Sequence, residues 1–62
     1  MTVIEIINKI KKSKTRLEVY NILIQSCKDP DITQETHLSV ILIQAKKQYR
    51  VIDSQNKQKL LN

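Results

Sequence analysis

The stretch KDPDITQE (residues 28–35) decides the fold, because it contains the only proline of a 62-residue chain that has no glycine. Asp29 followed by Pro30 is typical of a helix start, where aspartate caps the helix and proline takes the first helical position. The other acidic residues of the stretch would be favoured by the positive end of that helix. We therefore expect one turn at about residues 28–32, with a helix on each side of it.

Apolar residues on both sides of this turn repeat with spacings of three, four or seven, which is the period of one helix face. Before the turn they are Val3, Ile6, Ile10, Leu17, Tyr20, Ile24 and Cys27, and after it they are Leu38, Ile41, Leu42, Ala45, Tyr49 and Ile52. The sequence lacks the regular turn residues that several β-strands would require. It predicts an all-α fold: an antiparallel helical hairpin in a single domain, with helices at about 3–28 and about 32–58 and a frayed C-terminus.

The number of helices depends on the residues around Ser13 and Lys14. Thr2 followed by Glu5 fits a capping box, in which the side chains at the helix start satisfy free backbone amides, and Thr15 followed by Glu18 fits a second one. A break at this second box would give three helices, at about 3–12, 16–28 and 32–58. The apolar spacing continues across the break, however, and glycine, the usual helix stop, is absent. The sequence therefore favours one long first helix, kinked or broken near Ser13, and leaves three helices as the alternative.

The chain has more apolar side chains than the two seams of a hairpin can bury. Six of them lie away from the main seams, and burying each would contribute about 1.5–3 kcal/mol. These residues are Ile4, Val19, Ile22, Val40, Ile43 and Val51. We expect a second copy to cover them, with two hairpins forming a dimeric four-helix bundle. The alternative is a three-helix monomer whose wide core faces bury them.

The chain is basic, with eleven Lys and Arg residues against six Asp and Glu and a net charge of +5. Eight of the cationic residues fall into two groups, which a hairpin would bring side by side near its middle: Lys9, Lys11, Lys12, Lys14 and Arg16, and Lys46, Lys47 and Arg50. Such a patch could bind nucleic-acid phosphates or an acidic protein surface. A solvated lysine-rich face is the simpler interpretation.

The residue types required for catalysis or metal binding are scarce. Cys27 and His37 are the only cysteine and histidine, whereas a structural zinc site usually takes four such ligands;. We therefore expect no metal, no cofactor and no enzyme activity, and we interpret Cys27 as a small buried apolar residue. No apolar run exceeds four residues (40–43), so we expect no membrane span and a cytoplasmic protein.

These observations predict a non-catalytic interaction protein, a regulator or adaptor, rather than an enzyme. It would self-associate and dock a protein partner through an apolar stripe with basic flanks. Two alternatives remain open at this point. The protein could be a nucleic-acid-binding regulator that uses the basic patch, or a structural subunit of a larger assembly.

Overall fold

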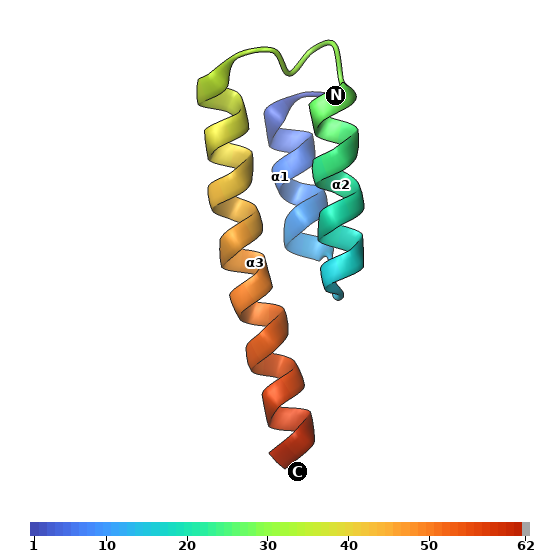
Figure 1. Ribbon diagram of the computed structural model, residues 1–62, viewed down its shortest axis with the longest axis vertical. Coiled ribbons are helices and arrows are strands. Elements are labelled where there is room, and N and C mark those ends of the chain that lie inside the picture. The colour runs from blue at the N-terminus through green and yellow to red at the C-terminus, as the bar shows by residue number, and fades with distance from the viewer. Residues whose placement is uncertain (62) are drawn as a thin grey trace.

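The computed structural model describes residues 1–61, which form three helices (Figure 1). They are α1 (Val3–Lys12), α2 (Arg16–Lys28) and α3 (Glu35–Leu61). Successive helices run in opposite directions and each packs against the other two. The third helix is the longest, so its C-terminal part extends beyond the other two and gives a molecule of 43 × 16 × 14 Å. The all-α prediction is confirmed, and no strand occurs in this part of the chain.

Both threonine caps predicted from the sequence are present. The Thr2 hydroxyl accepts a hydrogen bond from the amide of Glu5 at 3.2 Å, and that of Thr15 accepts one from the amide of Glu18 at 3.2 Å. The chain leaves the helix at Ser13, which is extended, and starts a new helix after Thr15. The interpretation as one long first helix is therefore wrong, because two local caps outweigh the apolar spacing that continues across them. The three helices match the alternative, and the dimeric bundle stays a prediction.

The connection between α2 and α3 is longer than the sequence predicts. Asp29 ends α2 rather than starting α3, and its carboxylate accepts a hydrogen bond from the amide of Asp31 at 2.9 Å. The third helix begins only at Glu35, three residues later than expected. The side chain of Ile32 is buried in the core, which anchors this loop across the end of the bundle.

Aliphatic side chains from all three helices and from the loop form the core. Its buried members are Ile6, Ile10, Val19, Ile32, Ile41, Ala45 and Ile52. In α1 and α3 these positions belong to the predicted seams, although Leu42 is exposed. In α2 the predicted seam is wrong: Leu17 and Tyr20 are 66% and 55% exposed, and Cys27 is exposed as well. The non-helical link before Thr15 breaks the register, so the apolar spacing from α1 does not carry over into α2.

Candidate interaction surfaces

A buried hydrogen bond fixes the end of α1 against α3. The Gln48 side-chain amide donates to the backbone carbonyl of Ser13 at 2.8 Å, and both residues are buried. The Ser13 hydroxyl in turn donates to the carbonyl of Lys9 at 3.0 Å. These bonds satisfy polar groups that would otherwise be left unpaired at the end of α1. They therefore set the position of the link between α1 and α2, and of Lys14 on it.

An ion pair connects the start of α2 to α3. The Arg16 Nε donates to the carboxylate of Asp53 at 2.9 Å, and a second nitrogen of the guanidinium binds the other carboxylate oxygen. The guanidinium also lies 5.1 Å from the centre of the Tyr49 ring, within the range of a cation–π contact;. The hydrogen bonds from Arg16 lower the pKa of the Asp53 carboxyl. Arg16 was predicted to belong to the basic patch, but its charge is already matched by a carboxylate.

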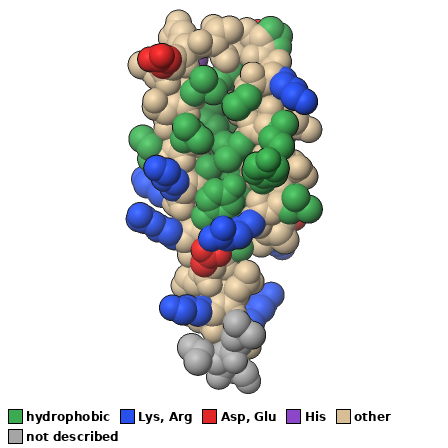
Figure 2. Space-filling model, in the orientation of Figure 1, with side chains coloured by type: hydrophobic (Ala, Val, Ile, Leu, Met, Phe, Trp, Pro, Cys, Tyr) green, Lys and Arg blue, Asp and Glu red, His purple; other side chains and the backbone are tan. Residues whose placement is uncertain are grey.

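The side of the bundle that carries this ion pair is apolar along most of its length. We define the α2–α3 face by four exposed residues, which are Leu17, Tyr20, Ile24 and Leu42. The first three lie on one side of α2, because they are spaced by three and four. Half-buried Leu23, Leu38 and Tyr49 lie beneath them and complete the surface. Figure 2 shows this side as a band of hydrophobic side chains running between α3 and α2.

The residues predicted to form an interface are distributed differently from what the sequence suggested. Val19 is fully buried in the core and Ile22 is half-buried against it, so Val19 cannot contact a partner and that prediction is corrected. The other four, Ile4, Val40, Ile43 and Val51, are exposed. They do not belong to the α2–α3 face. Ile43, for example, lies two residues from buried Ala45, which places it on the opposite side of α3.

Sequence reasoning missed the four residues of the α2–α3 face because it assigned them to the core seam. The signal that could have found them is the second capping box at Thr15. A helix that restarts there is free to turn a different side inward. Val19 and Ser26, spaced by seven, are then its buried positions.

The predicted basic patch is divided between two sides of α3. Lys11, Lys12 and Lys14 line a hollow of about 720 Å³ between the end of α1 and the projecting part of α3, where Lys59 joins them. The other group does not line this hollow. Its members, Lys46, Lys47 and Arg50, lie at the same level of the molecule but follow the outer side of α3. They are therefore directed away from the helix positions that face the bundle.

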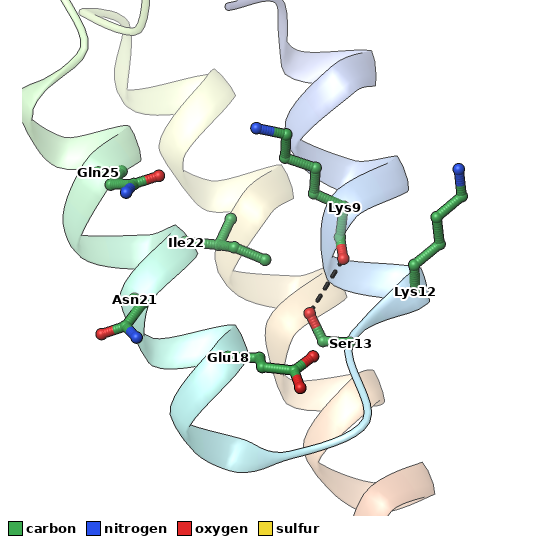
Figure 3. A pocket seen from close by; sticks show the side chains of 7 residues that line it. All are labelled: Lys9, Lys12, Ser13, Glu18, Asn21, Ile22 and Gln25. Carbon is green, nitrogen blue, oxygen red and sulfur yellow. Dashed lines mark hydrogen bonds between the residues drawn. The ribbon is translucent and has the colours of Figure 1, made fainter.

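A second hollow, of about 370 Å³, lies between α1 and α2 (Figure 3). Lys9 and Lys12 line it from α1, and Glu18 with the polar residues of α2 lines it from the other side. Ile22 lies on its floor between these polar side chains. Ser13 also lines this hollow, and its hydroxyl donates to the backbone carbonyl of Lys9 rather than to a carboxylate.

Charge is strongly segregated along the molecule. The segments 9–18 and 46–59 hold ten of the eleven Lys and Arg residues but only two of the six Asp and Glu. The remaining carboxylates are those of Glu5, Asp29, Asp31 and Glu35, near the loop at the opposite end. Two of them, on Asp29 and Asp31, accept hydrogen bonds from the Met1 amine at 3.0 and 3.1 Å. The bundle therefore has an acidic loop end and a basic end from which α3 projects.

No protein-family model, curated protein or solved structure matches this chain. Among the residues that the structure describes, no three His, Cys, Asp or Glu side chains come together as a metal site would require. None of the helices, over the same residues, has the length and apolar character needed to cross a membrane. The candidate sites are thus the α2–α3 face and the basic end.

Proposed function

We propose that the protein is a small, non-catalytic helical interaction protein that self-associates through the α2–α3 face. The observation that carries this proposal is the exposure of Leu17, Tyr20, Ile24 and Leu42 on one side of the bundle. Burying an exposed aliphatic or aromatic side chain of this size contributes up to about 1.5–3 kcal/mol. Contiguous apolar patches on an otherwise polar surface are typical of protein–protein contact sites.

The segregation of charge favours a second copy of the chain as the occupant of this face. In a two-fold symmetric dimer the same surface of each copy meets the other. If the two copies run antiparallel, the acidic loop end of each lies beside the basic end of its partner. Lys46, four residues after Leu42, borders the face toward the basic end, and Glu35 begins α3 at the loop end; neither has an ion-pair partner within residues 1–61;. Opposite charges would then match at both ends of the interface.

This arrangement keeps the four-helix bundle predicted from the sequence but builds it from different elements. The second and third helices of each copy would form the bundle, and α1 would cover its outer side. The α2–α3 face is small: α2 has 13 residues, hence a length of about 20 Å, and the molecule is 16 Å wide;. A stable interface usually buries about 800 Å² on each partner, so we expect a weak dimer in the micromolar range.

Sedimentation velocity from about 10 µM to about 1 mM protein tests the proposal over the range expected for an interface of this size. The wild-type chain should shift from monomer to dimer across this range. The double variant Leu17→Ser/Leu42→Ser should stay monomeric while its circular dichroism remains that of a folded helical protein. Both substitutions lie at exposed positions, so the monomer itself should be little affected.

The matched control is the double variant Ile4→Ser/Ile43→Ser, which removes two equally exposed aliphatic side chains outside the face. It should dimerise like the wild-type chain. If the control abolished the dimer and the first variant did not, the interface would instead contain the residues predicted from the sequence. A chain that stayed monomeric at every concentration would contradict self-association. Docking of a different protein, or a place in a larger assembly, would then be the function to test.

A further inference from the structure

The basic hollow lies on a different side of the molecule from the α2–α3 face and calls for a separate explanation. Four lysines line it from two separate parts of the chain: Lys11, Lys12 and Lys14 from the end of α1 and the link, and Lys59 from the projecting part of α3. No carboxylate lines it within residues 1–61. The side-chain amides of Gln55 and Asn56 lie on its α3 wall and can donate further hydrogen bonds;.

The ammonium groups in this hollow are not matched by acidic residues of the same chain. Over residues 1–61 the ion pairs involve Arg16 and the Met1 amine and none of the four lysines. The two carboxylates at this end of the molecule, those of Glu18 and Asp53, are already engaged. Asp53 binds Arg16, and Glu18 accepts a hydrogen bond from the backbone amide of Lys14 at 3.1 Å.

Lysines at the end of a helix are favoured by its negative dipole, which accounts for Lys11 and Lys12 in the last turn of α1;. It does not account for Lys14 on the link, nor for the convergence of lysines from two elements on one hollow. Gln48 makes this convergence a fixed feature of the fold, because its hydrogen bond to Ser13 holds the link against α3. The site is therefore built by the packing of the bundle and does not depend on a flexible tail.

We propose that this hollow binds the phosphate groups of a double-stranded nucleic acid. The lysine ammonium is a compact point charge suited to phosphate oxygens, and clusters of such charges contact the backbone without reading sequence. Single-stranded nucleic acid is less favoured, because its binding sites usually stack bases on aromatic side chains. The only aromatic residues, Tyr20 and Tyr49, belong to the α2–α3 side of the bundle. A duplex carries closely spaced phosphates on its outside, and the four lysines that line the hollow would contact them;.

Fluorescence anisotropy with a labelled DNA duplex of mixed sequence tests the proposal. We expect micromolar binding at about 50 mM salt, in the range of sequence-independent DNA binding. Each neutralised phosphate contributes about −0.9 to the slope of log K against log salt, so four contacts predict a slope of about −3.6. Between about 50 and about 200 mM salt the affinity should fall about 150-fold. A duplex RNA of the same sequence, run in parallel, tells whether the site also accepts A-form phosphate spacing.

The matched pair of variants separates this hollow from the overall charge. The first variant is Lys11→Gln/Lys12→Gln/Lys14→Gln/Lys59→Gln. The second is Lys46→Gln/Lys47→Gln/Arg50→Gln/Lys57→Gln, so both lose four charges. The first should lose at least about tenfold in affinity and most of the salt slope, since it removes the phosphate contacts themselves. The second should retain a slope close to that of the wild-type chain. Circular dichroism checks that both variants fold.

Three outcomes would overturn the proposal: no binding at about 50 mM salt, equal losses in the two variants, or equally strong competition by polyglutamate, which carries charge without phosphate. Tighter binding of single-stranded than of duplex nucleic acid would overturn the assignment to a duplex.

The proposal does not depend on self-association. The variant Leu17→Ser/Leu42→Ser leaves the hollow intact and should still bind DNA as a monomer, so a failure of either proposal can be recognised on its own.

Discussion

The two short helices α1 and α2 begin in the same way but bury their apolar side chains very differently. Each starts with a threonine that caps the amide three residues ahead. The first helix buries Ile6 and Ile10, the isoleucines of its predicted seam. The second buries Val19 and Ser26 and exposes the larger apolar residues that we assign to the α2–α3 face. The first helix thus places two isoleucines in the core, whereas the second fully buries only Val19 and Ser26 and exposes Leu17, Tyr20 and Ile24.

The largest expected effect comes from truncating a buried side chain of α1. We compare its cost in free energy of unfolding with that of truncating an exposed side chain of α2. Ile10→Ala should lower the free energy of unfolding by about 2–5 kcal/mol, because Ile10 is 0% exposed and its loss leaves a cavity;. Leu17→Ala should change it by less than about 0.5 kcal/mol when the protein is dilute enough to be monomeric. Urea denaturation followed by circular dichroism measures both values.

A domain of this size has only a few kcal/mol of stability, so Ile10→Ala could leave no folded protein to measure. The milder variant Ile10→Val should still cost about 0.5–1.5 kcal/mol and keeps the experiment decisive. If Leu17→Ala destabilised the dilute protein as strongly as Ile10→Ala, the exposed side of α2 would have to pack inside the monomer. The comparison between the two helices would then be wrong.

The next effect concerns the link between α1 and α2, which a hydrogen bond from Gln48 to Ser13 holds against α3. Gln48→Met keeps the size of the side chain but removes the donor to the Ser13 carbonyl, leaving that buried acceptor unpaired. The loss should be about 1–3 kcal/mol in the free energy of unfolding. Gln55→Met, on the exposed part of the same helix, is the control and should have almost no effect. Equal effects of the two substitutions in urea denaturation would show that the hydrogen bond to Ser13 does not fix the link between α1 and α2.

The third test asks whether the break between α1 and α2 is set by the local cap. Thr15→Ala removes the side chain that accepts from the amide of Glu18 and should cost about 1 kcal/mol;. Thr2→Ala, at the start of α1, should cost about the same, since the two caps share their geometry;. A neutral Thr15→Ala beside a costly Thr2→Ala would mean that packing alone breaks the chain there. Thermal unfolding of both variants provides the measurement.

The helix starts could be read from the sequence because a cap is a local interaction. Thr2 with Glu5 and Thr15 with Glu18 are recognisable without knowing the fold, and the structure confirms both pairs. The start of α3 could not be placed in this way. Asp29 and Pro30 resemble a helix start, yet Asp29 ends α2, a turn follows at residues 30–31, and Ile32 is buried in the core before α3 begins at Glu35. A contact distant in sequence decides that boundary.

The candidate surfaces were harder to predict than the helix starts, because they too depend on contacts between residues that are distant in sequence. Which side of α2 faces inward depends on the angle at which the chain leaves Ser13, and apolar spacing carries no information about that angle. Val19 was therefore assigned to the surface and Leu17 to the core, the reverse of the structure. The sequence also could not predict that Lys59 lies in the same hollow as Lys11, because this depends on how far α3 extends past the other two helices.

The smallest effect tests the contact that ties the start of α2 to α3. Hydrogen bonds from Arg16 lower the pKa of Asp53 in the folded protein, so this carboxylate stabilises the fold above its unfolded pKa of about 4;. The contribution is lost as the pH falls through the lower folded value. Asp53→Asn should therefore destabilise the protein slightly at neutral pH and not at all in acid, with the difference disappearing below about pH 4.

Because both side chains of this pair are at least half exposed, the difference should also shrink in high salt;. Urea denaturation of the wild-type chain and Asp53→Asn at several pH values measures it. Glu35→Gln is a useful control, since Glu35 lies at the other end of α3, far from Arg16. Equal stability of the wild-type chain and Asp53→Asn at every pH would mean that Arg16 holds α2 through the Tyr49 ring alone. The start of α2 would then depend on the same aromatic surface that borders the α2–α3 face, and disrupting that face would loosen the helix itself.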